Sequence, residues 1–383
     1  MTPVTAQRLL CLALAFAVAE PARADLPGRP LTDGAPGTNT GPEASPGDGR
    51  DEPRAPGRVQ QGADNGASPP EPRPEDTPAQ PEDAQPVTAQ PAAAPEENLR
   101  PVETWLEAQV ELARRGFSSG SIDGVRGPQS AAALRAFQRG AGLTENGELD
   151  KPTRESLLLT APAITRHTFS AEELAKIHPL AATWLGKSEQ TTLAYASALE
   201  LAAERYHASP NFLRRLNPGV TWDDLLPGVV IKVPAVERAT LSGRAAKLHV
   251  RLADHELEAT DETGRVIAHF PVSIARNVEK RPVGELHVTV VIPDPNYTFD
   301  PEVFPESPEG RELGRKLVIP PGPNNPVGIA WIGLDRTGYG IHGTPDPEKV
   351  GRTESHGCFR LANWDARTLY DLAWVGMPVI VEP

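Results

Sequence analysis

The spacing of apolar residues divides the chain into helix-forming and strand-forming stretches. Apolar side chains recur every three to four residues over 106–116 and again over 128–140. A proline opens the second stretch and a glycine closes each of them, which is typical of helix boundaries. A third helix is expected over 151–159, with Asp150 as its N-cap. We therefore predict a small three-helix unit in residues 99–163, called the first module below.

The following residues, 164–238, mix helical and extended patterns and are called the middle module. An Ala/Leu/Glu-rich segment over 193–206 and a shorter segment over 211–216 predict two helices. Residues 229–233 read Val-Val-Ile-Lys-Val and predict a short strand that ends at Pro234. The pattern favours a helix-rich segment with one strand.

From residue 244 onward the pattern changes to the two-residue period of β-strands. Alternating or β-branched runs predict strands at 248–252, 266–274, 283–292 and 378–381. The proline-rich stretch 293–326 is expected to be loop, and 365–372 to be a helix. Residues 244–383, the third module, are therefore predicted to form a mostly-β barrel or sandwich.

Residues 25–98 differ from the three modules in composition, because they are rich in proline and acidic residues. The chain of 383 residues has a net charge of −13, and residues 25–98 hold 14 Asp and Glu against five Arg, with 16 of the 42 prolines. Such a segment has too little apolar surface to offset the entropy of ordering, so we expect a disordered acidic linker. The acidic balance disfavours nucleic acid as a partner, because polyphosphates attract Lys and Arg.

The first 24 residues have the features of an export signal. Arg8 precedes an eleven-residue apolar run over 9–19, and Ala22 to Ala24 form a small-x-small cleavage site. The run is too short to span a bilayer. We expect a protein exported to the periplasm or cell wall, with no transmembrane helix in the mature chain and with Cys358 as its one cysteine.

Cys358 is the centre of the chemistry that the sequence predicts. His342, His356 and Arg360 lie near it in the sequence and would provide a positive field that favours the thiolate. Gly357 allows close approach of the backbone, so that its N–H and that of Cys358 can point at a developing oxyanion. We expect a nucleophilic cysteine whose thiol pKa lies below its ordinary value.

Two other interpretations of these residues stay open. Cys358 would be a structural core residue if its neighbours were coincidental. His342, His356 and Cys358 would instead bind zinc, although three ligands leave one position open and no acid partner for a metal-bound water is evident. The polar and charged neighbours favour the nucleophile, for which no metal or other cofactor is expected.

A series of motif positions spans the first module. It consists of Gln109, Leu112, Gly116-Phe117, Ile122-Asp123-Gly124, Gly127, Ala133-Leu134, Phe137-Gln138 and Gly142-Leu143. In order and spacing these residues resemble the peptidoglycan-binding-domain-1 family. The resemblance implies the cell-wall polymer as partner, with Asp123, Phe137 and Gln138 as candidate contacts. Asp123 also suits a turn that its own side chain stabilises, and this alternative is favoured.

A second set of positions lies near the end of the middle module. It comprises Ala203-Glu204-Arg205-Tyr206, Ser209, Leu213, Leu216-Asn217 and a closing Pro-Gly-x4-Val-Pro. These residues resemble the second half of a LysM module, a family that binds N-acetylglucosamine-containing glycans. The first half lacks the usual opening strand signature of that family, so a helical connector stays an equal alternative.

The most extensive set of motif positions lies in the third module. They are Arg281-Pro282-Val283-Gly284-Glu285, Asn324-Asn325-Pro326-x-Gly328, His342-Gly343-Thr344, Val350-Gly351, Ser355-His356-Gly357-Cys358-x-Arg360, and Asn363 with Asp365. This set resembles the L,D-transpeptidase catalytic domain, the YkuD-type family. The resemblance implies that Cys358 is the nucleophile, His342 the proton acceptor and donor, and the Gly343 carbonyl an orienting group. The remaining motif residues would shape the site, place the substrate carboxylate or support the fold: Ser355, His356, Gly357, Arg360 and Asn363.

The family resemblance implies an enzyme that acts on peptidoglycan stem peptides in cell-wall biogenesis and remodelling. Cys358 would attack the L-centre of diaminopimelate and expel D-Ala, and an amine would take the acyl group to form a 3→3 cross-link. Hydrolysis by a carboxypeptidase or endopeptidase is an alternative outcome, and a non-catalytic wall-binding scaffold is another. A protein acceptor is not identifiable. Carbapenem-type β-lactams, which acylate the family, are expected to label Cys358.

Overall fold

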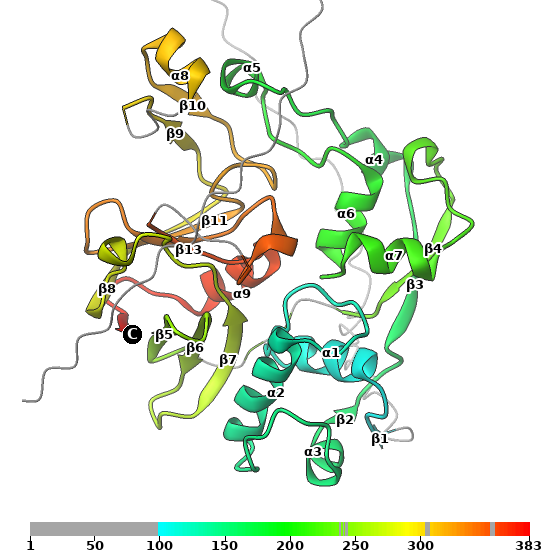
Figure 1. Cartoon of the computed structure of the whole chain (residues 1–383). Helices are drawn as coiled ribbons and strands as arrows, with labels where there is room; N and C mark the ends of the chain where they lie inside the picture. Colours follow the sequence, from blue (N-terminus) through cyan, green and yellow to red (C-terminus); the bar gives the residue numbers. More distant parts are fainter. Residues whose placement is uncertain (1–98, 237–238, 240, 242–243, 303–306, 353–356) are drawn as a thin grey trace, which may run out of the picture. The chain divides into compact units, whose positions relative to one another are not determined.

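The computed structural model describes residues 99–236, 239, 241, 244–302, 307–352 and 357–383 (Figure 1). The expected signal segment and linker, residues 1–98, lie outside this range, as do Ser355 and His356 of the candidate site. Among the described residues, no helix is long and apolar enough to cross a membrane. The described residues all belong to one compact unit, so contacts between the modules are part of the fold.

The first module contains the three predicted helices. They are α1 (Trp105–Arg114), α2 (Pro128–Gly140) and α3 (Lys151–Ser156). Asp150 caps α3 as expected, accepting a hydrogen bond from the Thr153 N–H at 3.0 Å. The third helix is shorter than predicted because its last residues form a strand, β2 (Leu158–Leu159), which pairs with β1 (Arg100–Pro101).

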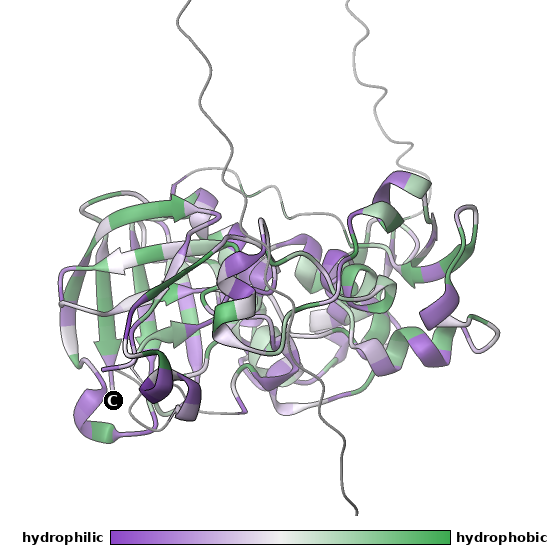
Figure 2. Ribbon diagram, turned by 90° about the horizontal axis from the view of Figure 1, so that it is seen from above, coloured by the Kyte–Doolittle hydropathy of each residue, from purple (hydrophilic) through white to green (hydrophobic). Residues whose placement is uncertain are grey.

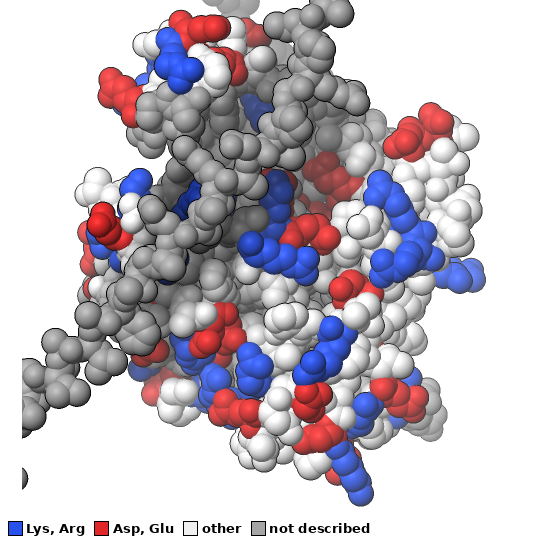
Figure 3. Space-filling model, viewed as in Figure 1, with Lys and Arg blue, Asp and Glu red and all other residues white. Residues whose placement is uncertain are grey.

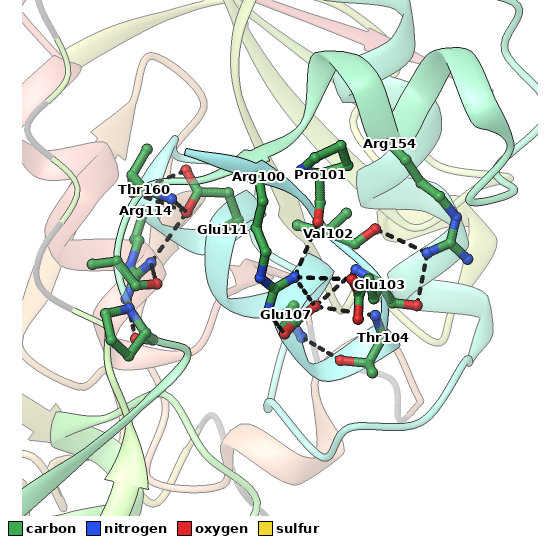
Figure 4. Close-up of polar contacts among 12 residues, drawn as sticks. Arg100, Pro101, Val102, Glu103, Thr104, Glu107, Glu111, Arg114, Arg154 and Thr160 are labelled. Carbon is green, nitrogen blue, oxygen red and sulfur yellow. Dashed lines mark hydrogen bonds and ion pairs between the residues drawn. The ribbon is translucent and has the colours of Figure 1, made fainter. Parts of the chain in front are cut away.

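Polar side chains fasten the start of the first module (Figure 4). Thr104 and Glu107 form a capping box at the start of α1, and Arg100 donates to Glu107 at 2.5 Å. Arg154 of α3 donates to the carbonyls of Val102 and Glu103 at 2.9 and 2.7 Å. These contacts satisfy backbone groups at the helix end and tie the first residues of the module to its last helix.

The middle module has both an opening and a closing strand. Its elements are β3 (Ile164–Thr168), α4 (Ala171–Ala175), α5 (Trp184–Glu189), α6 (Ala198–Arg205), α7 (Pro210–Leu216), the 3₁₀ turn η2 (Trp222–Asp224) and β4 (Val230–Pro234). β3 pairs antiparallel with β4, so a strand opens the module although the sequence lacks the usual signature of one. Most side chains of β3 are polar or exposed, which hid the strand pattern. Whether this module binds glycan stays a prediction.

The helix predicted over 193–206 begins later, at Ala198. Ser197 caps α6 by accepting a hydrogen bond from the Glu200 N–H. Leu193 precedes the helix, and its backbone forms hydrogen bonds with the third module. The Leu193 N–H donates to the Pro321 carbonyl at 2.9 Å, and the Asn324 N–H donates to the Leu193 carbonyl at 3.0 Å. A contact with the third module therefore overrides the local helical preference.

The third module is built on one eight-stranded sheet in the order β13-β12-β11-β8-β14-β5-β6-β7. Its strands are β5 (Lys247–Arg251), β6 (Glu256–Thr260), β7 (Val266–Pro271), β8 (Gly284–Pro293), β11 (Ala330–Leu334), β12 (Gly340–His342), β13 (Phe359–Arg360) and β14 (Pro378–Glu382). The β12–β13 and β14–β5 pairs are parallel and the others antiparallel. Long hydrophobic stretches mark these strands beside the C-terminus in Figure 2. The predicted mostly-β fold is confirmed.

The stretch expected to be loop contains regular structure. It holds β9 (Tyr297–Phe299), α8 (Pro308–Leu313) and β10 (Leu317–Ile319). Outside this stretch, 3₁₀ turns lie at η3 (Val278–Lys280) and η4 (Pro347–Lys349). β9 and β10 pair with each other, and Phe299, Leu317 and Ile319 are buried around Leu193 of the middle module. This small core contains side chains of the middle and third modules. It stabilises regular structure in a segment that was predicted to be loop because of its prolines. The predicted helix is α9 (Asn363–Leu372), which packs on β11.

The first module packs against β7, the edge strand at the opposite end of the eight-stranded sheet from β13. Phe117 pairs with His269 as a parallel bridge, and His269 Nδ1 donates to the Ser118 carbonyl at 3.0 Å. Arg139 of α2 donates to both carboxylate oxygens of Glu258 at 2.7 and 2.9 Å. Basic and acidic side chains are interspersed over the face drawn in Figure 3. The module is therefore joined to the sheet by backbone pairing and by an ion pair between one nitrogen of the partly exposed Arg139 and both oxygens of the buried Glu258 carboxylate.

Candidate functional site

A cleft of about 560 Å³ brings together the predicted nucleophile and base. His342, Gly357, Cys358 and Arg360 line it, together with Trp331 of β11. The parallel register of β12 and β13 sets Ile341 beside Phe359 and His342 beside Arg360. Cys358 therefore lies at the start of one strand and His342 at the end of its neighbour, although they are distant in sequence.

His342 is held as a neutral imidazole with a defined tautomer. Its Nδ1 lies 2.6 Å from the Gly343 carbonyl oxygen, and a carbonyl only accepts, so Nδ1 carries the proton. Nε2 is consequently left with its lone pair. The ring is stacked on Trp331, with centroids 5.6 Å apart. Burial lowers the pKa of His342 to about 4, with a smaller contribution from the charge of Arg360.

The pKa of the Cys358 thiol shifts in the opposite direction from the one predicted from the sequence. Its Sγ lies 3.5 Å from the Gly338 carbonyl oxygen. Burial raises the pKa of the thiol above its ordinary value, although a backbone hydrogen bond at Gly340 and the charge of Arg360 act in the opposite direction. The predicted lowering of this pKa was wrong, because withdrawal from water outweighs the positive field. At rest the pair is a neutral thiol and a neutral imidazole.

Asn363 lies directly behind the histidine, between two glycines. An added Cβ on Gly343 would lie 2.2 Å from Asn363 Oδ1, and one on Gly328 would lie 2.0 Å from the same atom. Gly328 also has a φ of +62°, in the left-handed region. The Asn363 side chain is fully buried, and its oxygen accepts from the Ile329 N–H at 3.4 Å. Both glycines are therefore required for this packing.

The cleft carries more positive than negative charge. Arg360 and Lys280 both line it, and the one acidic lining residue among those described, Asp300, pairs with Lys316 at 2.7 Å. Tyr297 also lines the cleft, and burial raises its pKa to about 12. The site is suited to a ligand with carboxylates. Lys280, although adjacent to a motif arginine, was not identified from the sequence.

The candidate contacts of the first module have mainly structural positions. Gln138 is fully buried and donates to Asn146, Glu148 and Thr153. Phe137 is buried and packs edge-to-face on Phe117, with centroids 5.8 Å apart. Gln138 spends its amide on contacts inside the module, which favours a structural role. Phe137 also lines a cavity of about 240 Å³, so a polymer contact at Phe137 stays a prediction.

Asp123 is half-buried and forms a turn with its own side chain. Its Oδ1 accepts from the Val125 N–H at 2.9 Å and from Gln109 Nε2 at 2.9 Å. This is the turn geometry that the sequence favoured. A glycan contact at Asp123 stays a prediction.

The zinc alternative involves a residue outside the described part of the chain. Within the residues that the structure describes, no group of three or more His, Cys, Asp or Glu side chains is arranged to hold a metal. His356, one of the three proposed ligands, is not among them.

Family comparisons agree with the geometry of the cleft. The L,D-transpeptidase catalytic domain family matches residues 245–381, and the putative peptidoglycan binding domain family matches residues 102–157. Residues 245–381 are therefore similar to L,D-transpeptidase catalytic domains. The cleft with Cys358 and His342 lies within this domain, and the three helices of the first module lie within the other match.

Curated relatives carry the same family name. The chain is 24% identical over 194 residues to the putative L,D-transpeptidase YkuD of Bacillus licheniformis, covering 48% of this chain and 93% of the relative. It is 34% identical over 118 residues to the putative L,D-transpeptidase YqjB of Bacillus subtilis, covering 29% and 57%. It is 29% identical over 193 residues to the probable L,D-transpeptidase YbiS of Escherichia coli, covering 48% and 60%. The chain thus spans less than two thirds of the latter two relatives.

Proposed function

We propose that the catalytic domain transfers acyl groups from peptidoglycan stem peptides through a thioester on Cys358. The observation that carries the proposal is the meeting of Cys358, the neutral base His342 and the cation Arg360 in one cleft. A nucleophilic thiol needs a base in reach and a means of holding the substrate, and the cleft contains both. Its excess of positive charge suits stem peptides, which carry several carboxylates.

The acylation step follows from the neutral pair. As Sγ attacks the carbonyl carbon at the L-centre of diaminopimelate, its proton passes to His342 Nε2. The Gly357 and Cys358 N–H groups stabilise the oxyanion. Collapse of the intermediate breaks the peptide bond, and the imidazolium returns the proton to the amine of the departing D-Ala. The thioester keeps the acyl group activated without a nucleotide or metal.

The second step regenerates the thiol. The side-chain amine of a second stem attacks the thioester and gives up a proton to His342, and the proton then passes to the departing sulfur. The product is a 3→3 cross-link. Water in place of the amine would give a trimmed stem. Arg360 is placed to hold the substrate carboxylate by a charge-assisted hydrogen bond.

Mass analysis of muropeptides tests this function. Incubation of purified full-length protein with disaccharide-tetrapeptides is expected to yield dimers joined through diaminopimelate and to release D-Ala. Arg360→Gln is expected to raise the substrate concentration for half-maximal rate by about tenfold to a hundredfold, from loss of a bond of roughly 1.5–3 kcal/mol. Release of D-Ala with tripeptides only would show a hydrolase, and unchanged muropeptides would contradict both.

We further propose that the chain is exported and that the first module holds it at the cell wall. Full-length Cys358→Ala protein is expected to co-sediment with purified sacculi, including sacculi from which an amidase has removed the stem peptides. Binding to peptide-free glycan would assign the contact to the polymer rather than to the catalytic cleft. Recovery of the folded protein in the supernatant with both preparations would contradict a tethering role.

A further inference from the structure

The middle module contributes a carboxyl group to the back of the catalytic site. Glu204 of α6 is 8% exposed, and both of its oxygens lie 3.0 Å from Asn363 Nδ2. Asn363 belongs to α9 of the catalytic domain, whereas Glu204 lies outside the residues that match that family. Two elements far apart in the sequence are therefore joined by a buried hydrogen bond.

The contacts of Asn363 lead directly to the catalytic base. Its Nδ2 is fixed by Glu204 and by the Pro323 carbonyl at 3.0 Å, and this fixes which way its Oδ1 faces. Oδ1 lies against the backbone of Gly343, where even one added carbon would collide with it. The Gly343 carbonyl in turn accepts the proton of His342 Nδ1 at 2.6 Å. A rotation of the carboxamide would thus displace the group that orients the imidazole.

Other contacts keep Glu204 in place and brace the cleft wall. Tyr195 donates to Glu204 Oε1 at 3.3 Å, and Glu200, one turn earlier on α6, accepts from Asn324 Nδ2 at 2.5 Å. Trp184 of α5 stacks on Phe299 with centroids 4.4 Å apart. Phe299 belongs to β9, whose Tyr297 lines the cleft. The middle module therefore contacts both β9, which carries a lining residue of the cleft, and Asn363, which lies against the glycine that orients His342.

We propose that Glu204 is a positioning residue for His342, acting through Asn363 and Gly343. This inference rests on the proposed function, since it assumes that His342 is the base for Cys358. It assigns to the middle module a role in catalysis that is separate from any binding of glycan. A hydrogen bond that locks a carboxamide behind an orienting carbonyl acts by preorganisation, because it removes alternative orientations of the ring.

Acylation of the full-length protein by a carbapenem, followed by mass spectrometry, tests the proposal. Glu204→Leu removes the acceptor at similar volume and is expected to lower the maximal acylation rate by about tenfold to a hundredfold. The carbapenem concentration for half-maximal rate should stay unchanged, because the cleft itself is intact. Glu204→Gln keeps an acceptor oxygen for Asn363 and is expected to stay within about threefold of the unmodified protein.

The pH profile separates positioning from general destabilisation. In the described part of the chain, the charged or titratable groups that line the cleft with His342 are Lys280, Tyr297, Asp300, Cys358 and Arg360. Those around Glu204 are Tyr195, which donates to it, and Glu200, Arg214, Asp346, Glu348 and Lys349, which line a cavity with it. A loosened imidazole gains contact with water, so the acid limb of the Glu204→Leu profile should move upward from about 4 toward 6.5. Glu258→Gln is the matched control, since that carboxylate is also buried at a module junction but bonds only to arginines.

The outcomes are distinguishable. A folded Glu204→Leu protein with the maximal rate and acid limb of the unmodified protein would overturn the proposal, as would an equal change in Glu258→Gln. If Glu204→Leu does not fold, Glu204→Asp replaces it, since the shorter side chain withdraws the carboxyl from Asn363 and should show the same changes. Failure of the unmodified protein to acylate at Cys358 would instead contradict the proposed function.

Discussion

Replacement of Cys358 by Ala is expected to abolish both formation of the acyl-enzyme and turnover of muropeptides. In the proposed mechanism the thiol supplies the bond that holds the acyl group. Loss of a nucleophile costs about 10⁴-fold or more in enzymes that work through a covalent intermediate. Intact-mass spectrometry after incubation with a carbapenem should show one adduct on the unmodified protein and none on the variant.

Cys358→Ser serves as the matched control for this experiment. The hydroxyl keeps the shape of the side chain and its proton, but it is a much weaker nucleophile than a thiol. It should fold and bind substrate, and it should acylate very slowly or not at all. Labelling of Cys358→Ala at the rate of the unmodified protein would show that the reactive group lies elsewhere, and the mechanism would have to be abandoned.

Acylation should persist to unusually low pH. His342 accepts the thiol proton only while neutral, and burial lowers its pKa to about 4 from an ordinary 6.5. Because the pKa is depressed, the base is lost only as the pH falls through about 4. At pH 5 about nine tenths of His342 would remain neutral, whereas a histidine with an ordinary pKa would be almost wholly protonated. The rate of β-lactam acylation against pH, measured where circular dichroism shows folded protein, checks this.

His342→Gln separates the base from the thiol. Without an acceptor, the rate should follow ionisation of Cys358 itself, whose pKa burial raises from its ordinary 9.0. The variant should therefore be slow at neutral pH and gain rate up to alkaline pH. The unmodified protein should also lack the ultraviolet absorbance of a thiolate at neutral pH. That absorbance, or an acid limb near 6.5, would contradict a neutral resting pair.

Local signals in the sequence determined the helices of the first module. Pro128 at the start and Gly140 at the end set both boundaries of α2, and Asp150 set the start of α3. Such signals suffice because caps and prolines act on the backbone within one turn. The same locality explains the prediction of a strand up to Pro234, which β4 includes as its last residue.

Contacts between residues distant in the sequence decided what the sequence misassigned. Leu193 pairs with Pro321 and so delays α6, and β9 and β10 are ordered over a stretch whose prolines favoured loop. β3 was missed because its partner β4 lies more than sixty residues away, and pairing at that distance leaves no local pattern. In each case the stabilising partner belongs to another part of the chain.

The sequence by itself determined which residues are the candidates for the chemistry, and only the tertiary structure decided their ionisation and support. Cys358, His342 and Arg360 could be selected by residue type and motif, because nucleophiles, bases and cations are defined by their functional groups. The direction of the thiol and imidazole pKa shifts depends on how much water the fold excludes. Burial outweighs the nearby positive charge at the thiol, whereas at the imidazole burial and that charge both lower the pKa. The contact of Glu204 with Asn363 depends on the packing of α6 near α9, which no local pattern encodes.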